Sequence, residues 1–151
     1  MSNAPYKTIV CLGDSITCDW KTPSYVNFWQ ELCDQEYGAN QVSLINAGIN
    51  GETAQDGYYR THRDIVERKP DLVTIMFGHN DAEPNRNVSP VLFANYIRKI
   101  VNYIQHHSPQ TTIWILSPNG IGDAQFEKKY QPYLDQLQQV ANDKNVMYVS
   151  L

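Results

Sequence analysis

The chain has 151 residues, of which 42% are hydrophobic and 19% are charged. This length and composition suit one globular domain with a buried core, so we expect a single domain over residues 1–151. Twelve lysines and arginines against sixteen acidic residues give a net charge of −4. Because no basic run is present to neutralise a phosphate backbone, nucleic acid is not an expected partner.

Apolar runs, the N-terminus and the cysteines predict the compartment. The longest uninterrupted apolar runs, residues 9–12 and 113–116, are far shorter than the roughly 18 residues that a membrane helix needs, so no span is expected. The segment Met1–Tyr6 lacks the basic-then-apolar layout of a signal peptide. The three cysteines, Cys11, Cys18 and Cys33, lack the paired spacing of a zinc or redox site. We therefore expect a cytoplasmic protein with free thiols.

Short β-branched apolar runs alternate along the chain with longer amphipathic patterns. Continuous apolar character over a few residues is typical of strands that are covered on both faces. The runs predicted as strands are Thr8–Leu12, Val42–Ile45, Leu72–Phe77, Ile113–Leu116 and Val146–Val149. Strict alternation of strands and helices predicts a three-layer α/β/α sandwich with a five-stranded parallel sheet and right-handed crossovers.

Four amphipathic helices are predicted between these strands. The first is expected to begin at Thr22 and Pro23 and to bury Tyr25, Phe28, Trp29, Leu32 and Cys33. The others are expected from Thr53 to about Lys69, from Ser89 to His107, and along Phe126, Tyr130, Tyr133, Leu134, Leu137 and Val140. In parallel sheets of this kind ligands bind where strands end and loops begin, at the carboxyl edge.

Three polar, glycine-containing segments follow the first three predicted strands. They are Gly13–Thr17 (GDSIT), residues 46–53 (NAGINGET) and Gly78–Asp81 (GHND). All three are expected to converge on the carboxyl edge of the sheet. A serine hydroxyl, a glycine amide and an asparagine amide together supply a nucleophile and neutral donors for a developing oxyanion.

Each segment also has an ordinary structural interpretation. Glycine after a strand commonly serves a positive φ or close packing, and an Asn-Asp pair commonly forms a turn or cap. We expect Asp14 and Asp81 to accept backbone N–H bonds in their turns rather than to act as acids. Trp20, Tyr58 and Tyr59 follow the loops and are either walls of a binding pocket or aromatic residues that simply pack.

Taken together, the three segments resemble the SGNH (GDSL-type) hydrolase family over essentially the whole chain. The resemblance implies a flavodoxin-like SGNH hydrolase fold and ester hydrolysis through an acyl-serine intermediate, with no metal or organic cofactor. It implies that Ser15 is the nucleophile. It also implies that the Ser15 backbone amide, Gly51 and Asn80 form the oxyanion hole.

The same resemblance implies a general base that this chain lacks. The family places its base histidine and partner aspartate in an Asp-x-x-His block beyond the fifth strand, and no such pattern occurs in the 151 residues. We therefore expect a chain truncated before that block, with little or no turnover of its own. His62, His106 and His107 are expected at solvated helix positions, whereas His79 is expected to line the substrate pocket together with Trp20.

Two functions remain open. One is a serine esterase for short-chain acyl esters, lipid-like or acetylated carbohydrate, because brief loops provide no evident lid or long acyl channel. The other is a non-catalytic binding or regulatory module. A phosphate-binding module is disfavoured because the loops match neither a Walker A nor a GxGxxG pattern. Self-association is expected through the flank that the missing segment would leave exposed.

Overall fold

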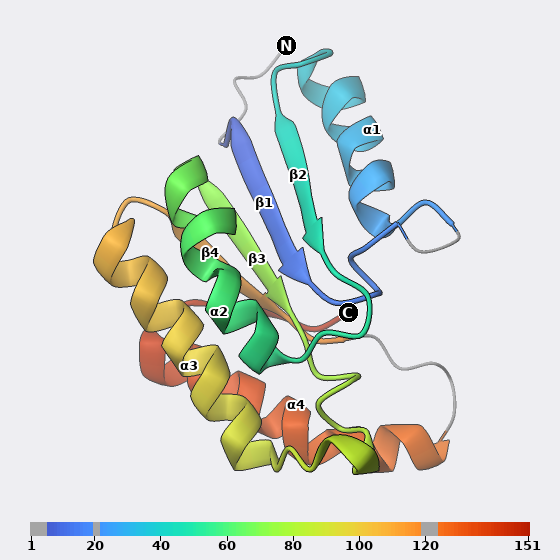
Figure 1. Ribbon diagram of the computed structural model, residues 1–151. Coiled ribbons are helices and arrows are strands. Elements are labelled where there is room, and N and C mark those ends of the chain that lie inside the picture. Colours follow the sequence, from blue (N-terminus) through green and yellow to red (C-terminus); the bar gives the residue numbers. More distant parts are fainter. Residues whose placement is uncertain (1–5, 20–21, 119–123) are drawn as a thin grey trace.

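The computed structural model describes residues 6–19, 22–118 and 124–151, with side chains from residue 128 onward in the last segment. Five strands form one sheet in the order β2-β1-β3-β4-β5, and every neighbouring pair is parallel. The strands are β1 (Thr8–Gly13), β2 (Ser43–Gly48), β3 (Leu72–Met76), β4 (Thr112–Leu116) and β5 (Met147–Val149). The predicted α/β sandwich with a five-stranded parallel sheet is confirmed (Figure 1).

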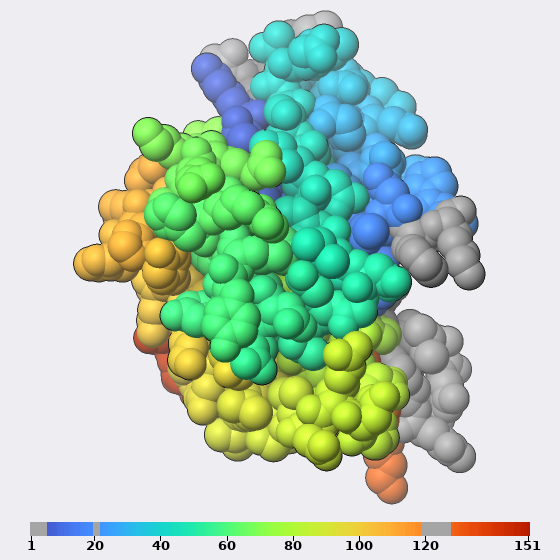
Figure 2. Space-filling view, in the orientation of Figure 1, coloured from blue at the N-terminus to red at the C-terminus, as the bar shows by residue number. Residues whose placement is uncertain are grey.

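The connecting helices divide unequally between the two faces of the sheet. They are α1 (Tyr25–Tyr37), α2 (Ala54–Asp64), α3 (Pro90–His107) and α4 (Ala124–Lys144). The connection from β1 to β2 runs along the sheet in the opposite direction from the three later ones. Because such crossovers are right-handed, α1 covers one face and the other three helices cover the opposite face. The helices α2 and α3 lie against each other over that second face (Figure 2).

The larger core lies between the sheet and the three-helix face. It is formed by alternate strand residues such as Val10, Leu12, Val73 and Ile75 together with helix residues such as Phe93, Ile97, Ile100 and Leu137. Burying one aliphatic side chain of this kind contributes about 1.5–3 kcal/mol, so the core holds the strand ends firmly in place. None of the described helices is long and apolar enough to cross a membrane.

Helix α1 departs from the predicted start and stripe. Its N-cap is Ser24, whose hydroxyl accepts a hydrogen bond from the Val26 amide, and not Thr22. Phe28 and Leu32 were expected inside, yet their exposed fractions are 58% and 62%. The periodicity is that of an amphipathic helix, but the sheet lies on the side of Val26 and Cys33. The buried face predicted from the sequence is therefore rotated around the helix axis from the face that actually packs on the sheet.

Helix α2 is also shorter than predicted. It ends at Asp64 rather than near Lys69, and a 3₁₀ turn, η1 (Val66–Arg68), follows it. Lys69 then adopts a left-handed φ of 48° immediately before Pro70. The residue before a proline is disfavoured in the α conformation, so the chain leaves the helix before it reaches that point.

Helix α1 leaves part of its face of the sheet uncovered. Leu72 of β3 is fully buried there, but Trp114 of β4 is half-buried and Met147 of β5 is 54% exposed. Leu32 lies three residues from Trp29 and four from Phe28, so these side chains share one flank of α1. We call Phe28, Leu32, Trp114 and Met147 the uncovered flank.

Candidate active site

The three predicted loops begin side by side at the carboxyl edge of the sheet. Gly13 at the end of β1 is in register with Gly48 of β2 on one side and with Met76 of β3 on the other. The loops that follow are residues 14–19 (loop 1), 49–53 (loop 2) and 77–83 (loop 3). The predicted convergence of these loops on one edge is confirmed.

Loops 1 and 2 are each tied to the end of the neighbouring strand. The Ile49 amide donates to the Gly13 carbonyl at 3.1 Å, and the Asn46 side-chain amide donates to the Thr17 carbonyl at 2.7 Å. A side chain at Gly48 would collide with the backbone of Cys18, so this position requires glycine for close approach. The end of β2 therefore supports the turn that carries Ser15.

Loops 2 and 3 are joined by two consecutive residues. The Asn80 side-chain amide donates to the Glu52 carbonyl at 2.8 Å. The Asp81 carboxylate accepts the Ala54 amide at 3.1 Å, at the start of α2. Because an amide nitrogen carries two hydrogens, Asn80 keeps a second N–H after its bond to Glu52.

The carboxyl groups of Asp14 and Asp81 serve the backbone, as predicted. Asp14 accepts the Ile16 amide at 3.0 Å, and each of the two residues is only 1% exposed. Burial raises the pKa of Asp14 to about 6. Burial likewise raises the pKa of Asp81 to about 7, against the opposing hydrogen bond from Ala54 and with a further contribution from the charge of Asp14. Burial is therefore the main reason that both carboxyl groups hold a proton more tightly than usual.

Ser15 borders an open pocket at this edge of the sheet. The serine is half-buried in the turn after β1, and the pocket beside it has a volume of about 340 Å³. The other residues that line it are Ile16, Cys18, Thr22, Pro23, Ser24, Tyr25, Met76 and Leu151. Trp20, predicted to bind substrate, falls outside the described residues.

Gly51 lies in loop 2 with a positive φ of 80°, a conformation that favours glycine. The guanidinium of Arg86, in the 3₁₀ turn η2 (Pro84–Arg86), donates to the Gly51 carbonyl at 3.0 Å. Loop 2 therefore has its Gly51 carbonyl held by Arg86 and its Glu52 carbonyl held by Asn80. Both carbonyls are engaged on the side of loop 3.

Three of the four histidines lie at the surface, as predicted. His62, His106 and His107 are exposed. His79 is half-buried in loop 3, and its ring lies 4.8 Å from the ring of Tyr130 on α4. Its predicted role in binding substrate remains a prediction. Tyr58 packs against Tyr96 and Tyr103 on α3, which matches the simple packing interpretation.

Arg60 on α2 is a site residue that the sequence analysis missed. Its side chain is 7% exposed and contacts both loop 1 and loop 2. The sequence did contain one signal. Gly57, Thr61 and Asp64 recur at the three- and four-residue spacing of one helix face together with Arg60, and this buried face is unusually polar. Buried polar side chains at such spacing require partners, and here the partners are the loops.

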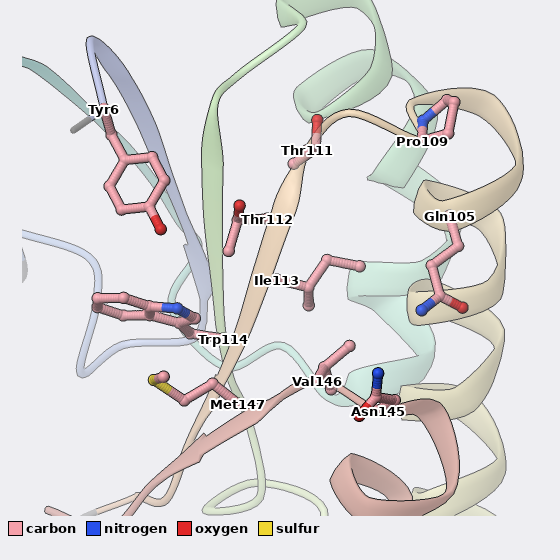
Figure 3. Close-up of a pocket in the computed structure, with 10 residues that line it drawn as sticks. All are labelled: Tyr6, Gln105, Pro109, Thr111, Thr112, Ile113, Trp114, Asn145, Val146 and Met147. Carbon is pink, nitrogen blue, oxygen red and sulfur yellow. The ribbon is translucent and has the colours of Figure 1, made fainter.

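A second pocket of about 350 Å³ lies at the opposite, amino edge of the sheet (Figure 3). Tyr6, Trp114 and Met147 project into it from one side of the strands, and Gln105 and Asn145 lie on the other side. Its ten lining residues include no histidine, cysteine or carboxylate. Within the described part of the chain, no group of three or more His, Cys, Asp or Glu side chains is placed to hold a metal ion.

The fold and the loops define a class of α/β proteins that have a parallel sheet and a serine in the loop after the first strand. The family model for the GDSL-like lipase/acylhydrolase family matches residues 11–151, and the chain belongs to that family.

Curated relatives carry several different names. An uncharacterized lipoprotein YqeF of Bacillus subtilis is 29% identical over 83% of the chain and 56% of its own length. An acetylxylan esterase of Geobacillus stearothermophilus is 33% identical over 48% of the chain and 39% of its own length. An arylesterase of Vibrio mimicus is 31% identical over 69% of the chain and 51% of its own length. The chain thus spans about half the length of the curated relatives that it matches.

Solved structures share the fold. An acetyl xylan esterase, AlAXEase, superposes with a TM-score of 0.85 at 22% identity, over 95% of this chain and 77% of that one. The acetylxylan esterase Axe2 of Geobacillus stearothermophilus, in a form described as a catalytic mutant with a serine replaced by alanine, gives 0.81 at 21% identity, over 94% and 74%. Other Axe2 structures described as catalytic mutants have an aspartate or a histidine replaced.

Proposed function

We propose that the whole protein is a serine ester hydrolase that acts on short-chain acyl esters. The observation that carries the proposal is a network of hydrogen bonds at the carboxyl edge of the sheet. It ties loop 1, which carries Ser15, to the end of β2, ties loop 2 to the end of β1, and ties loop 3 to loop 2 and to the start of α2. Membership of a family of lipases and acylhydrolases supports the same reaction class. In this proposal the Ser15 hydroxyl attacks the ester carbonyl carbon, the alcohol leaves, and water then releases the acid from acyl-Ser15.

The proposed oxyanion hole consists of the backbone amides of Ser15 and Gly51 and the side-chain amide of Asn80. Charge develops on the carbonyl oxygen as the tetrahedral intermediate forms, so donors held rigidly at that position lower the barrier. The bond from Asn80 to Glu52 supports this role, because it orients the amide and leaves its second hydrogen to donate. Removal of one such donor typically costs about 10²–10³ in turnover.

The general base is the part of the mechanism that these residues do not supply. An Asp-x-x-His pattern does not occur in the 151 residues, and His79 is packed against Tyr130. Removing the base histidine from a comparable serine hydrolase costs on the order of 10⁶ in kcat. We therefore expect weak turnover from the 151-residue chain.

The proposed substrate class follows from the pocket beside Ser15. Its volume of about 340 Å³ is at the lower end for ligand pockets, and both polar and apolar side chains line it. A pocket of this size suits an ester with a small acyl group. Acetyl esters of aromatic alcohols or carbohydrates fit this description, and relatives named arylesterase and acetylxylan esterase support it.

The first prediction is acetylation of Ser15 by 4-nitrophenyl acetate. Because 4-nitrophenolate is a good leaving group, acylation should suffer less from the lack of a base than deacylation by water. An acyl-enzyme should therefore accumulate and add the mass of one acetyl group to the intact protein. Added imidazole, a free general base, should raise the rate of nitrophenol release by the chain above that of Ser15→Ala.

The exposed serine Ser43, at the start of β2, provides the matched control, and Ser43→Ala should behave as the parent does. An acetyl adduct of equal yield in Ser15→Ala would remove Ser15 from its assigned role. The absence of any adduct or imidazole-dependent hydrolysis would favour the second candidate, a non-catalytic ligand-binding module. That candidate would bind its ligand in the open pocket beside Ser15.

A further inference from the structure

Arg60 is a buried cation with three separate partners. Its Nε donates to Glu52 at 2.7 Å, its Nη1 to Asp64 at 2.7 Å, and its Nη2 to the Gly13 carbonyl at 3.0 Å. The guanidinium is planar and rigid, so these three bonds fix the relative positions of the three acceptors.

One of these acceptors directly precedes the proposed nucleophile. The Gly13 carbonyl ends β1 and is separated from Ser15 by a single residue. It also accepts the Ile49 amide at 3.1 Å, so loop 2 and α2 meet at the same oxygen. A shift of this carbonyl would move the turn that carries Ser15.

A second acceptor directly follows the proposed oxyanion-hole glycine. Glu52 is held at its carboxylate by Arg60 and at its backbone carbonyl by Asn80. Gly51 lies next to it in the chain. One guanidinium therefore spans the two loops that carry the nucleophile and a proposed donor.

The third bond, to Asp64, lies within α2 and could form without the bonds of Arg60 to Gly13 and Glu52. Asp64 lies four residues after Arg60 and also binds Arg63, at 2.6 Å and 2.9 Å. Although burial opposes its ionisation, the hydrogen bonds from Arg63 and Arg60 lower the pKa of Asp64. A helix-stabilising i,i+4 pair needs only the contact between Arg60 and Asp64, so it does not account for the bonds of Arg60 to Glu52 and Gly13.

We propose that Arg60 is a positioning residue for this site, which sets the separation between the Ser15 turn and Gly51 by holding the Gly13 carbonyl and Glu52 together. The catalytic part of this proposal rests on the hydrolase function proposed above. A displacement of about 1 Å between reacting groups can cost roughly 100-fold in rate. The loss of the Arg60 fork is therefore expected to slow the chemical step more than it weakens ester binding.

The test compares Arg60→Lys with Arg63→Lys. Both substitutions keep the charge beside Asp64, but a lysine ammonium cannot span three acceptors in the guanidinium geometry. R60K should reduce the limiting rate of Ser15 acetylation by 4-nitrophenyl acetate roughly 10- to 100-fold, with the half-saturating ester concentration changed by less than about threefold. Amide hydrogen exchange over residues 13–19 and 49–53 should be faster in R60K, with exchange in α3 unchanged. R63K should match the parent in every measurement.

The possible results distinguish a failure of the Arg60 proposal from a failure of the proposed hydrolase function. Equal acetylation and equal loop exchange in R60K and R63K would overturn the role of Arg60. A parent chain that is not acetylated would contradict the hydrolase function, and loop exchange alone would then decide whether Arg60 couples the loops. If R60K loses the exchange protection of α3 and is therefore unfolded, Glu52→Gln decides, because it weakens only the loop 2 contact. Parental loop exchange and acetylation in E52Q would then reject the proposal.

Discussion

Asp81 shows, at the scale of single residues, how a buried polar side chain determines the placement of a loop. Its carboxylate joins loop 3 to the start of α2, and its neighbour Asn80 joins loop 3 to Glu52. Sequence reasoning predicted that Asp81 would accept a backbone N–H, because aspartate commonly does so in turns. The identity of the donor was not predictable, since Ala54 lies 27 residues earlier in the chain.

The burial of Asp81 predicts an unusual dependence of stability on pH. Its pKa rises from 3.8 to about 7 in the folded protein. The folded state therefore binds a proton that the unfolded state has lost, and this contribution to stability disappears as pH rises from about 4 to 7. Urea unfolding of the parent should show a free energy that falls over this range, with a slope from Asp81 approaching ~1.4 kcal/mol per pH unit.

Asp81→Asn should reduce that slope, because the amide has no proton to lose, and should leave the part below about pH 6 that Asp14 contributes through its own raised pKa. Asp71→Asn is the control, because the pKa of Asp71 is shifted in the opposite direction from that of Asp81. Hydrogen bonds from the Thr8 and Lys7 amides lower the pKa of Asp71, so its contribution is lost only as pH falls through that lowered pKa. A slope between pH 5 and 8 that is the same in D81N and the parent would contradict the assignment.

At the scale of elements, α2 is the helix that organises the site. It begins directly after loop 2, carries Arg60, and packs on Phe77 at the start of loop 3. The close contact is made at Gly57, where a side chain would collide with the ring of Phe77. The glycine therefore lets α2 approach the sheet closely enough for Arg60 to reach the Gly13 carbonyl.

Gly57→Ala sets two effects against each other. Alanine favours a helix over glycine by about 1 kcal/mol, whereas overpacking a core costs about 1–3 kcal/mol. Because Phe77 is only 1% exposed and has little room to move, overpacking should win. We expect G57A to lower the free energy of unfolding by up to about 2 kcal/mol, measured by urea denaturation.

A second substitution checks the steric cause. Phe77→Leu should cost less stability in the G57A background than in the parent, because the smaller side chain relieves the collision. Equal costs in the two backgrounds, or a G57A protein as stable as the parent, would show that the helix does not depend on this contact.

At the scale of the whole molecule, the unequal division of helices leaves apolar surface on one side. Trp29 and Trp114 line one pocket on the α1 face, and Trp114 and Met147 line the pocket at the amino edge (Figure 3). Trp114 lines both pockets and so links Trp29 of α1 to Met147 of β5, while Phe28 and Leu32 of the uncovered flank are exposed on α1 itself. Monomeric proteins rarely expose contiguous apolar patches of more than a few hundred Å².

We expect the 151-residue chain to self-associate through this flank. Light scattering after size-exclusion chromatography should show a mass that rises with protein concentration, and Leu32→Glu should shift the chain toward the monomer. Val91 on α3 is 60% exposed but lies on the other face, so Val91→Glu should leave the mass unchanged. A monomer at every concentration, or equal effects of the two substitutions, would contradict this expectation.

The alternation of apolar runs with amphipathic patterns was enough to predict the parallel sheet and the meeting of three loops at one edge. This was possible because strand and helix periods are local, and parallel strands with right-handed crossovers leave few arrangements. The family motifs likewise singled out Ser15, Gly51 and Asn80 without any coordinates. Only the tertiary structure decided that Phe28 and Leu32 face outward and that Arg60 reaches Gly13, 47 residues away. Such contacts depend on the order of strands and on which helix flank meets the sheet, and these are properties of the assembled layers rather than of any segment.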